Sequence, residues 1–194
     1  MDRFRHEQAV AAIDAANADD PDTLEWLGES RPKELLHAEL MTRWVRRLDP
    51  DPTEAQLLAA RAHHLRRWAL HRSAYPEGRA GYLRWRKECS RRHQADVAAI
   101  LADLGYDPVE VARVQEIIGK VDLATDPQVQ VHEDALCLVF LQTQFTALAD
   151  RLGDDKTVEV VRRTIAKMSP RGRSEALELP LGDRERAIVG RALA

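Results

Sequence analysis

The chain has 194 residues, 31% of them charged, and a formal net charge of −3, which suits one domain with its own core and does not favour a long nucleic acid as partner. The two cysteines, Cys89 and Cys137, lie far apart, which excludes a disulfide framework and favours a reducing compartment. Because the N-terminal MDRFRHEQAV is charged and no apolar run approaches ~18 residues, we expect a cytoplasmic protein without signal peptide or membrane span.

Apolar residues recur at helical spacing along most of the chain, and strand-like alternation is nearly absent. This pattern predicts an all-α fold, a single helical domain over residues 1–194 with about seven to eight helices. In chain order we expect helices at about 3–18, 32–48, 53–70, 82–104, 107–119, 126–151, 155–168 and 183–193. The segments 18–32 and 71–81 are predicted to be loops.

Several of these boundaries carry local signals. Thr53 and Gln56 have the spacing of a capping box at a helix start. Pro32, Pro108 and Pro127 suit first helical turns, where the missing N–H has no partner to lose.

Polar residues on apolar helix faces predict the functional site. His37, His64 and His93 lie on the apolar stripes of three different helices. Asp134 lies on the apolar face of the most hydrophobic helix, and a buried carboxylate must be paired, hydrogen-bonded or bound to a metal. Because histidines and carboxylates that converge from several helices build metal centres in bundle cores, we expect a divalent metal here: Mn, Fe, Zn or Co.

The ligand set leaves alternatives open. Glu39, on the flank of the same helix as His37, is a rival ligand, and Glu133 is a candidate general base or an orienting group for a ligand histidine. Asp134 can equally pair with an arginine of RAHHLRRW in a buried salt bridge without chemistry. A single histidine on an apolar face is usually a core residue with a satisfied N–H.

The order of these residues resembles the HD superfamily of metal-dependent phosphohydrolases. That superfamily is all-helical, and its motif is a His, a His-Asp doublet and a distant Asp, sometimes with extra histidines between. Here His37, the pair His63-His64, His93 and Asp134 follow one another in that order. The doublet itself is missing, because Leu65 follows His64. The resemblance implies an HD-domain-like bundle and leaves open which residue supplies the second carboxylate, with Glu39 and Glu133 as candidates.

A second resemblance covers most of the chain. It is carried by the motifs PKELLHAELMTRW, RAHHLRRW, YPEGRAGYLRWR, HEDALCLVFLQTQF, DDK and KMSPRG, together with the lone His93. In these motifs the chain resembles the family called domain of unknown function 4202. The resemblance implies that the site involves His64, the YPEGRAGYLRWR segment, His93 and the Glu133-Asp134 pair, with His37 ranked below them.

Arginines concentrated between residues 61 and 92 predict an anion site. The segment YPEGRAGYLRWR precedes a helix start, whose free N–H groups attract anions, and Arg79, Arg84 and Arg86 add guanidinium groups suited to phosphate. Lys120 is a further candidate phosphate ligand, although a helix C-terminal charge is the ordinary explanation. These arginines can also form a solvated basic face.

Together these features predict a metal-dependent hydrolase of a phosphate ester, with a nucleotide as one possible substrate. A variant with two irons and oxygen chemistry uses similar ligands. The competing hypothesis is a non-catalytic helical module with a buried His/Asp network, whose arginine face binds a protein or an RNA segment.

Overall fold

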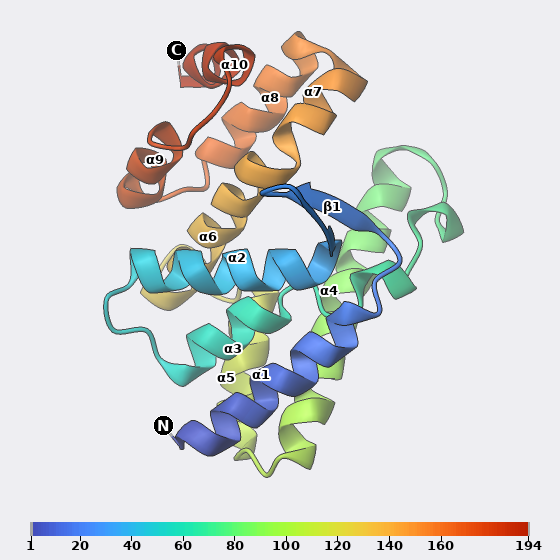
Figure 1. Ribbon diagram of the computed structural model, residues 1–194, viewed down its shortest axis with the longest axis vertical. Coiled ribbons are helices and arrows are strands. Elements are labelled where there is room, and N and C mark those ends of the chain that lie inside the picture. The colour runs from blue at the N-terminus through green and yellow to red at the C-terminus, as the bar shows by residue number, and fades with distance from the viewer. Residues whose placement is uncertain (1, 194) are drawn as a thin grey trace.

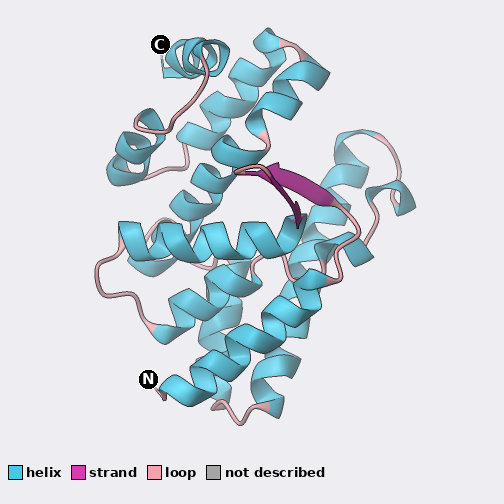
Figure 2. Ribbon diagram, viewed as in Figure 1, coloured by secondary structure: helices cyan, strands magenta, loops and turns pink. Residues whose placement is uncertain are grey.

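The computed structural model describes residues 2–193, and its architecture is all-α apart from one short hairpin, as Figures 1 and 2 show. Its helices are α1 (Arg3–Ala18), α2 (Lys33–Leu48), α3 (Glu54–Ala62), α4 (Gly78–Asp103), α5 (Pro108–Gly119), α6 (Pro127–Thr143), α7 (Phe145–Leu152), α8 (Asp154–Ile165), α9 (Pro170–Leu177) and α10 (Asp183–Leu193). The short 3₁₀ turns η1 (Arg67–Ala69) and η2 (Arg72–Ala74) lie between α3 and α4. Among the described residues, no helix is both long and apolar enough to cross a membrane.

Two hydrophobic clusters form the core. One is built by α2, α6 and the C-terminal helices and includes Leu40, Leu138 and Phe145. The other is built by α1, α3, α4 and α5 and includes Ile13 and Val97. In Figure 1, α7, α8 and α10 occupy one end of the molecule and α1, α3 and α5 the other, with α2 and α6 between them. Because α6 spans the two ends, its polar residues lie between the two clusters.

The structure confirms the all-α fold and several predicted ends. The first, fifth and last helices have the expected bounds within a residue. Thr53 and Gln56 form the predicted capping box, in which the Gln56 N–H donates to Thr53 Oγ1 and the Thr53 N–H donates to Gln56 Oε1. Asp107 forms a second capping box with Glu110, and Pro108 follows at the first helical position.

The helix predicted over 53–70 was too long, because α3 ends at Ala62. Residues 63–66 form a turn in which Arg66 is left-handed, with φ 51°. No glycine or proline marks this turn. Its backbone groups are satisfied from outside the segment, since Arg66 N–H donates to Asn17 on α1 and His93 Nδ1 on α4 donates to the Leu65 carbonyl.

Other predicted elements also needed correction. The helix predicted over 126–151 is divided at Gln144 into α6 and α7, and α4 begins at Gly78, earlier than expected. The helix α9 was not predicted. The predicted loop 18–32 contains an antiparallel hairpin of β1 (Thr23–Trp26) and β2 (Glu29–Pro32). Its two-residue turn, Leu27-Gly28, has positive φ at both positions, and a leucine there gives no turn signal.

Candidate metal centre and adjoining cavity

A buried carboxylate and two imidazoles meet at one point between α2 and the turn after α3. Glu34 Oε2 lies 3.0 Å from His37 Nδ1 and 2.9 Å from His64 Nδ1. The side chains of Glu34 and His37 are only 3% and 2% exposed. Glu34 and His37 share one face of α2 because they are three residues apart. In the described part of the chain this is the one group of three His, Cys, Asp or Glu residues spaced to hold a metal ion.

Burial sets the charge of this group. It lowers the pKa of His64 to about 3, an effect opposed by Glu34 and assisted by Arg67, so this imidazole is neutral at pH 7. Burial alone would raise the pKa of Glu34, but His64 and His37 outweigh it and hold that pKa well below its usual range. The group at neutral pH is therefore a carboxylate that faces nitrogen donors.

His93 is held in one tautomer beside this group. Its Nδ1 lies 2.8 Å from the Leu65 carbonyl oxygen, which can only accept, so Nδ1 carries the proton. Burial lowers the pKa of His93 to about 4, and the ring is therefore neutral with a lone pair on Nε2. That Nε2 is buried and has no hydrogen-bond partner among the described residues, and the ring centroid lies 6.0 Å from that of His64.

His63 and His132 extend the cluster to five imidazoles. His132 Nε2 lies 2.7 Å from His63 Nδ1, and the His63 and His64 ring centroids are 4.5 Å apart. Burial, with a contribution from the Lys120 charge, lowers the pKa of His132 to about 3. The sequence analysis placed His63 away from the site and did not consider His132. The sequence feature that could have indicated a role for His132 is its position next to Glu133 in a strongly apolar helix.

A cavity of about 600 Å³ adjoins the cluster. His63, His64 and His93 line it, whereas Glu34 and His37 do not. Its lining also contains six basic residues, Arg67, Arg86, Lys87, Lys120, Arg163 and Lys167. Glu133 is the one acidic residue among the described residues that line it, so the cavity carries an excess of positive charge that suits an anionic ligand.

Glu133 lies at this cavity in contact with two lysines. Its carboxylate pairs with Lys120 Nζ, and Lys167 Nζ lies 3.6 Å from Oε1. Glu133 is 2% exposed, so the lysines supply the charge that keeps a buried carboxylate stable. Cys137, one helical turn further along α6, is a buried thiol whose pKa is raised to about 12, mainly by burial and then by Glu133.

The structure does not bring Asp134 into the imidazole group, which corrects the predicted ligand set. Asp134 Oδ1 accepts hydrogen bonds from Ser169 N–H at 2.9 Å and from Gln130 Nε2 at 3.0 Å, and Oδ2 accepts from Ser169 Oγ at 2.5 Å. It therefore faces the start of α9. Neither a metal nor the predicted arginine is needed to explain its burial.

Glu39 also lies outside the group. Its two carboxylate oxygens accept hydrogen bonds from Arg31 of β2 at 2.9 and 2.8 Å. Glu34, not Glu39, is the carboxylate of α2 that meets the histidines. The signal in the sequence was the spacing Glu34-x-x-His37, which places two ligands on one helix face.

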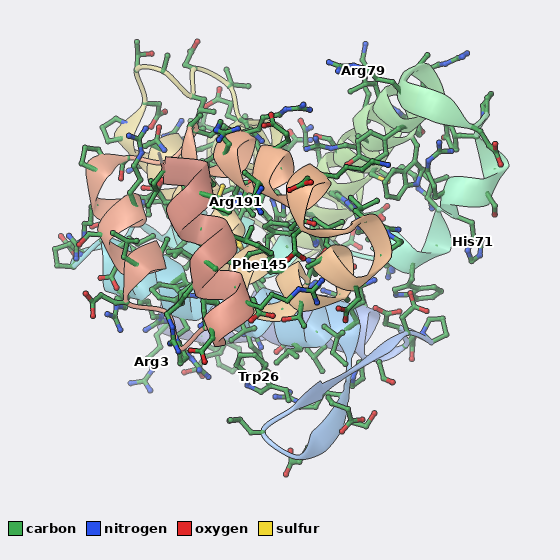
Figure 3. The ribbon with its side chains drawn as sticks, turned by 90° about the horizontal axis from the view of Figure 1, so that it is seen from above. Arg3, Trp26, His71, Arg79, Phe145 and Arg191 are labelled. Carbon is green, nitrogen blue, oxygen red and sulfur yellow. The ribbon has the colours of Figure 1, made fainter. Side chains whose placement is uncertain are left out.

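Two of the four predicted phosphate-binding residues line the cavity and two do not. Arg86 and Lys120 line the cavity. Arg79 and Arg84 are exposed and do not line it, and Figure 3 shows Arg79 at the outer edge of the molecule. Because α4 begins at Gly78, Arg79 lies in its first turn, on the same side of the helix as Leu83 and Arg86 but one turn before them, where it does not reach the cavity.

Comparisons with known proteins give one match. Neither the curated proteins nor the solved structures contain a match to the chain. The family described as Domain of unknown function (DUF4202) matches residues 7–189, which covers all the residues of the imidazole cluster and the cavity. The chain therefore belongs to the DUF4202 family.

Proposed function

We propose that the protein is a metal-dependent hydrolase of phosphate esters, with Glu34, His37 and His64 as ligands of a divalent cation. The observation that carries the proposal is the position of this buried group directly beside a cavity with basic walls. His64 joins the two, because it contacts Glu34 through Nδ1 and also lines the cavity.

The donor set fits Mn, Fe, Zn or Co. Two imidazoles and a carboxylate are common ligands of these ions, with metal–ligand bonds of about 2.0–2.2 Å, so neighbouring ligand atoms of a tetrahedral site are about 3.4 Å apart. The 2.9 and 3.0 Å contacts need only a small adjustment to reach that spacing. When bound, such a cation lowers the pKa of a water and stabilises charge on phosphoryl oxygens.

Residues that line the cavity can bind the substrate and assist the cation. Arg67, Arg86 and Lys87 offer cationic donors for the phosphoryl oxygens. His93 offers a lone pair on Nε2 as a hydrogen-bond acceptor or further ligand. Glu133, predicted as a general base, contacts two lysines, an arrangement that suits holding the lysines better than taking up a proton.

A non-catalytic binding module is the alternative function. The Glu34 carboxylate already accepts from two imidazoles, and His63 pairs with His132, so a buried polar network can form without a cation. In that case the basic cavity wall binds an acidic protein segment or RNA.

Metal analysis separates the two functions. The purified protein is incubated with Mn²⁺, Fe²⁺, Zn²⁺ or Co²⁺ and desalted, and its metal content is measured. We expect near-stoichiometric metal in the wild type and in Glu39→Gln, and at least a tenfold weaker affinity in Glu34→Gln, since loss of one charged ligand is worth more than about 1.4 kcal/mol. Metal-free protein under all four conditions would favour the module.

Activity is then assayed on a panel of phosphate monoesters and diesters with the metal that binds. Phosphate release that requires the metal and is lost in Glu34→Gln supports the hydrolase. Oxygen consumption by the iron-loaded protein would instead support the oxidative variant.

A further inference from the structure

Five of the six basic residues of the cavity form two groups with different partners. Arg67 and Arg86 come from η1 and α4 and lie over the aromatic rings of Trp85 and Tyr82, at 4.6 and 5.9 Å from the ring centroids. The other group, Lys120, Arg163 and Lys167, comes from the end of α5 and from α8 and the turn that follows it. Its two lysines share Glu133.

The two groups also lie beside different imidazoles. The Arg67 N–H donates to the His64 carbonyl oxygen at 2.9 Å, so Arg67 lies on the same turn as the proposed metal ligand. Lys120 pairs with Glu133, the residue that follows His132 on α6, so Lys120 lies on the side of the His63–His132 pair.

The second group, which we call the lysine group, has a net positive charge even when Glu133 is counted. Lys120, Arg163 and Lys167 carry three positive charges and Glu133 carries one negative charge, which leaves two. A phosphate monoester carries ~−2 at neutral pH. Glu133 is buried and pairs with both ammonium groups, so it holds Lys120 in place and keeps the exposed Lys167 nearby before a ligand arrives.

The backbone conformation at Lys120 accompanies the position of its side chain in the cavity. Lys120 follows the last turn of α5 with φ 60° and ψ 39°, a left-handed conformation that glycine usually supplies at this position. A side chain there is disfavoured by about 1–2 kcal/mol. Such strain is typical of residues that a site requires, and here it turns the lysine towards Glu133 and the cavity.

We propose that the lysine group is a second anion subsite and that the substrate carries two phosphate groups. One phosphate lies at the His64 and Arg67 end, where it is cleaved, and the other binds Lys120, Arg163 and Lys167 without being cleaved. This inference rests on the proposed function for the identity of the cleaved phosphate. The binding of two separated phosphates does not depend on it.

The test uses metal-free protein in EDTA, so that binding is measured without turnover. Isothermal titration calorimetry compares alkanediol bisphosphates of three to eight carbons with alkyl monophosphates of the same length. We expect one chain length at which the bisphosphate binds about tenfold tighter, since a second charge-assisted contact is worth ~1.4 kcal/mol or more. The double variant Lys120→Met/Lys167→Met should reduce this preference to about twofold. That factor remains because either of the two phosphates of the probe can occupy the one subsite that is left.

The matched control is Lys156→Met, an exposed lysine of α8 outside the cavity, which should keep the full preference. If the double variant does not fold, Lys167→Met alone replaces it, because Lys167 is exposed and its loss leaves Lys120 paired with Glu133. Equal affinity for both probe types at every length, or a preference that survives the lysine changes, overturns the second subsite. A preference found in a protein without hydrolase activity would keep the subsite and reject the proposed function.

Discussion

Asp134 ties α6 to the beginning of α9. Ser169 donates both its N–H and its hydroxyl hydrogen to the Asp134 carboxylate. Its Oγ also caps α9 by accepting from Gly172 N–H at 3.1 Å. A methyl group on Gly172 would lie 2.6 Å from Asp134 Cγ, so α9 packs directly on the carboxyl group. The carboxylate is therefore explained by helix docking.

Replacing Asp134 by alanine should destabilise the protein without removing the metal. Three hydrogen bonds are lost and the part-buried Ser169 donors are left without their acceptor, which costs about 2–3 kcal/mol of unfolding free energy. Urea denaturation measures this loss, and metal content should match the wild type. Glu159→Ala, which removes an exposed pair with Arg162, should change stability by less than ~0.5 kcal/mol. Loss of metal in Asp134→Ala would restore the ligand set that the sequence predicted.

The sequence could identify a buried carboxylate but not its partner. Asp134 lies on a strongly apolar helix, so its burial was predictable, whereas Ser169 is 35 residues away and its helix α9 was not predicted. Glu34 lies in the first turn of α2, where an acidic residue is ordinary because it favours the helix dipole. Its role depends on where the turn after α3 places His64, and helical periodicity carries no information about that turn.

At the scale of elements, the turn at residues 63–66 creates the site. A continuous helix through this segment would point His63 and His64 about 100° apart. With α3 ended at Ala62, both rings instead line the same cavity. The left-handed Arg66 and its contact with Asn17 make this turn possible.

Arg66→Gly should therefore raise the free energy of unfolding. Glycine adopts φ 51° without the steric penalty of a side chain, and the net gain after its greater unfolded-state entropy is about 0.5–1 kcal/mol. Thermal and urea denaturation measure the change. Lys156→Gly, within α8, should lower stability by about 1 kcal/mol instead. A destabilised Arg66→Gly would show that the Arg66 side chain, not its backbone, supports the turn.

Elements with local signals were predictable, and those held by distant contacts were not. Proline and capping residues identified α5 and the starts of α3 and α6. The division between α6 and α7 at Gln144 has no such marker. The hairpin turn at Leu27-Gly28 likewise depends on strand pairing and on packing of Trp26 against the core.

At the scale of the whole molecule, three of the clustered imidazoles make stability depend on pH. Burial lowers the pKa of His64, His93 and His132 to about 3, 4 and 3, whereas in the unfolded chain each titrates near 6.5. Below pH 6.5 the unfolded state therefore binds more protons than the folded state. The stability that these residues contribute is complete above that pH and is lost as pH falls towards 3.

Between pH 7.5 and 5.5, each such imidazole should remove about 1 kcal/mol of unfolding free energy from the metal-free protein. Urea denaturation in EDTA at both pH values gives the difference. In His132→Gln the difference in unfolding free energy between the two pH values should be smaller by about 1 kcal/mol, the contribution of one imidazole. His71→Gln, which changes an exposed imidazole, should leave it unchanged. An equal pH dependence in wild type and His132→Gln would show that the pKa of His132 is not lowered by folding.

His64 is the one member of the proposed ligand group that also borders the cavity, as far as the described residues extend. Its ring therefore has a second role beside that of a ligand, because it lies between the cavity and Glu34 and shields the Glu34 oxygens from bulk water. Shortening this side chain would let water pass from the cavity to the buried face of α2 and hydrate the Glu34 carboxylate. Loss of metal binding in His64→Ala would then have two causes, the lost ligand nitrogen and the water that reaches Glu34. Glu34→Gln removes a ligand but leaves the His64 ring between the cavity and the site.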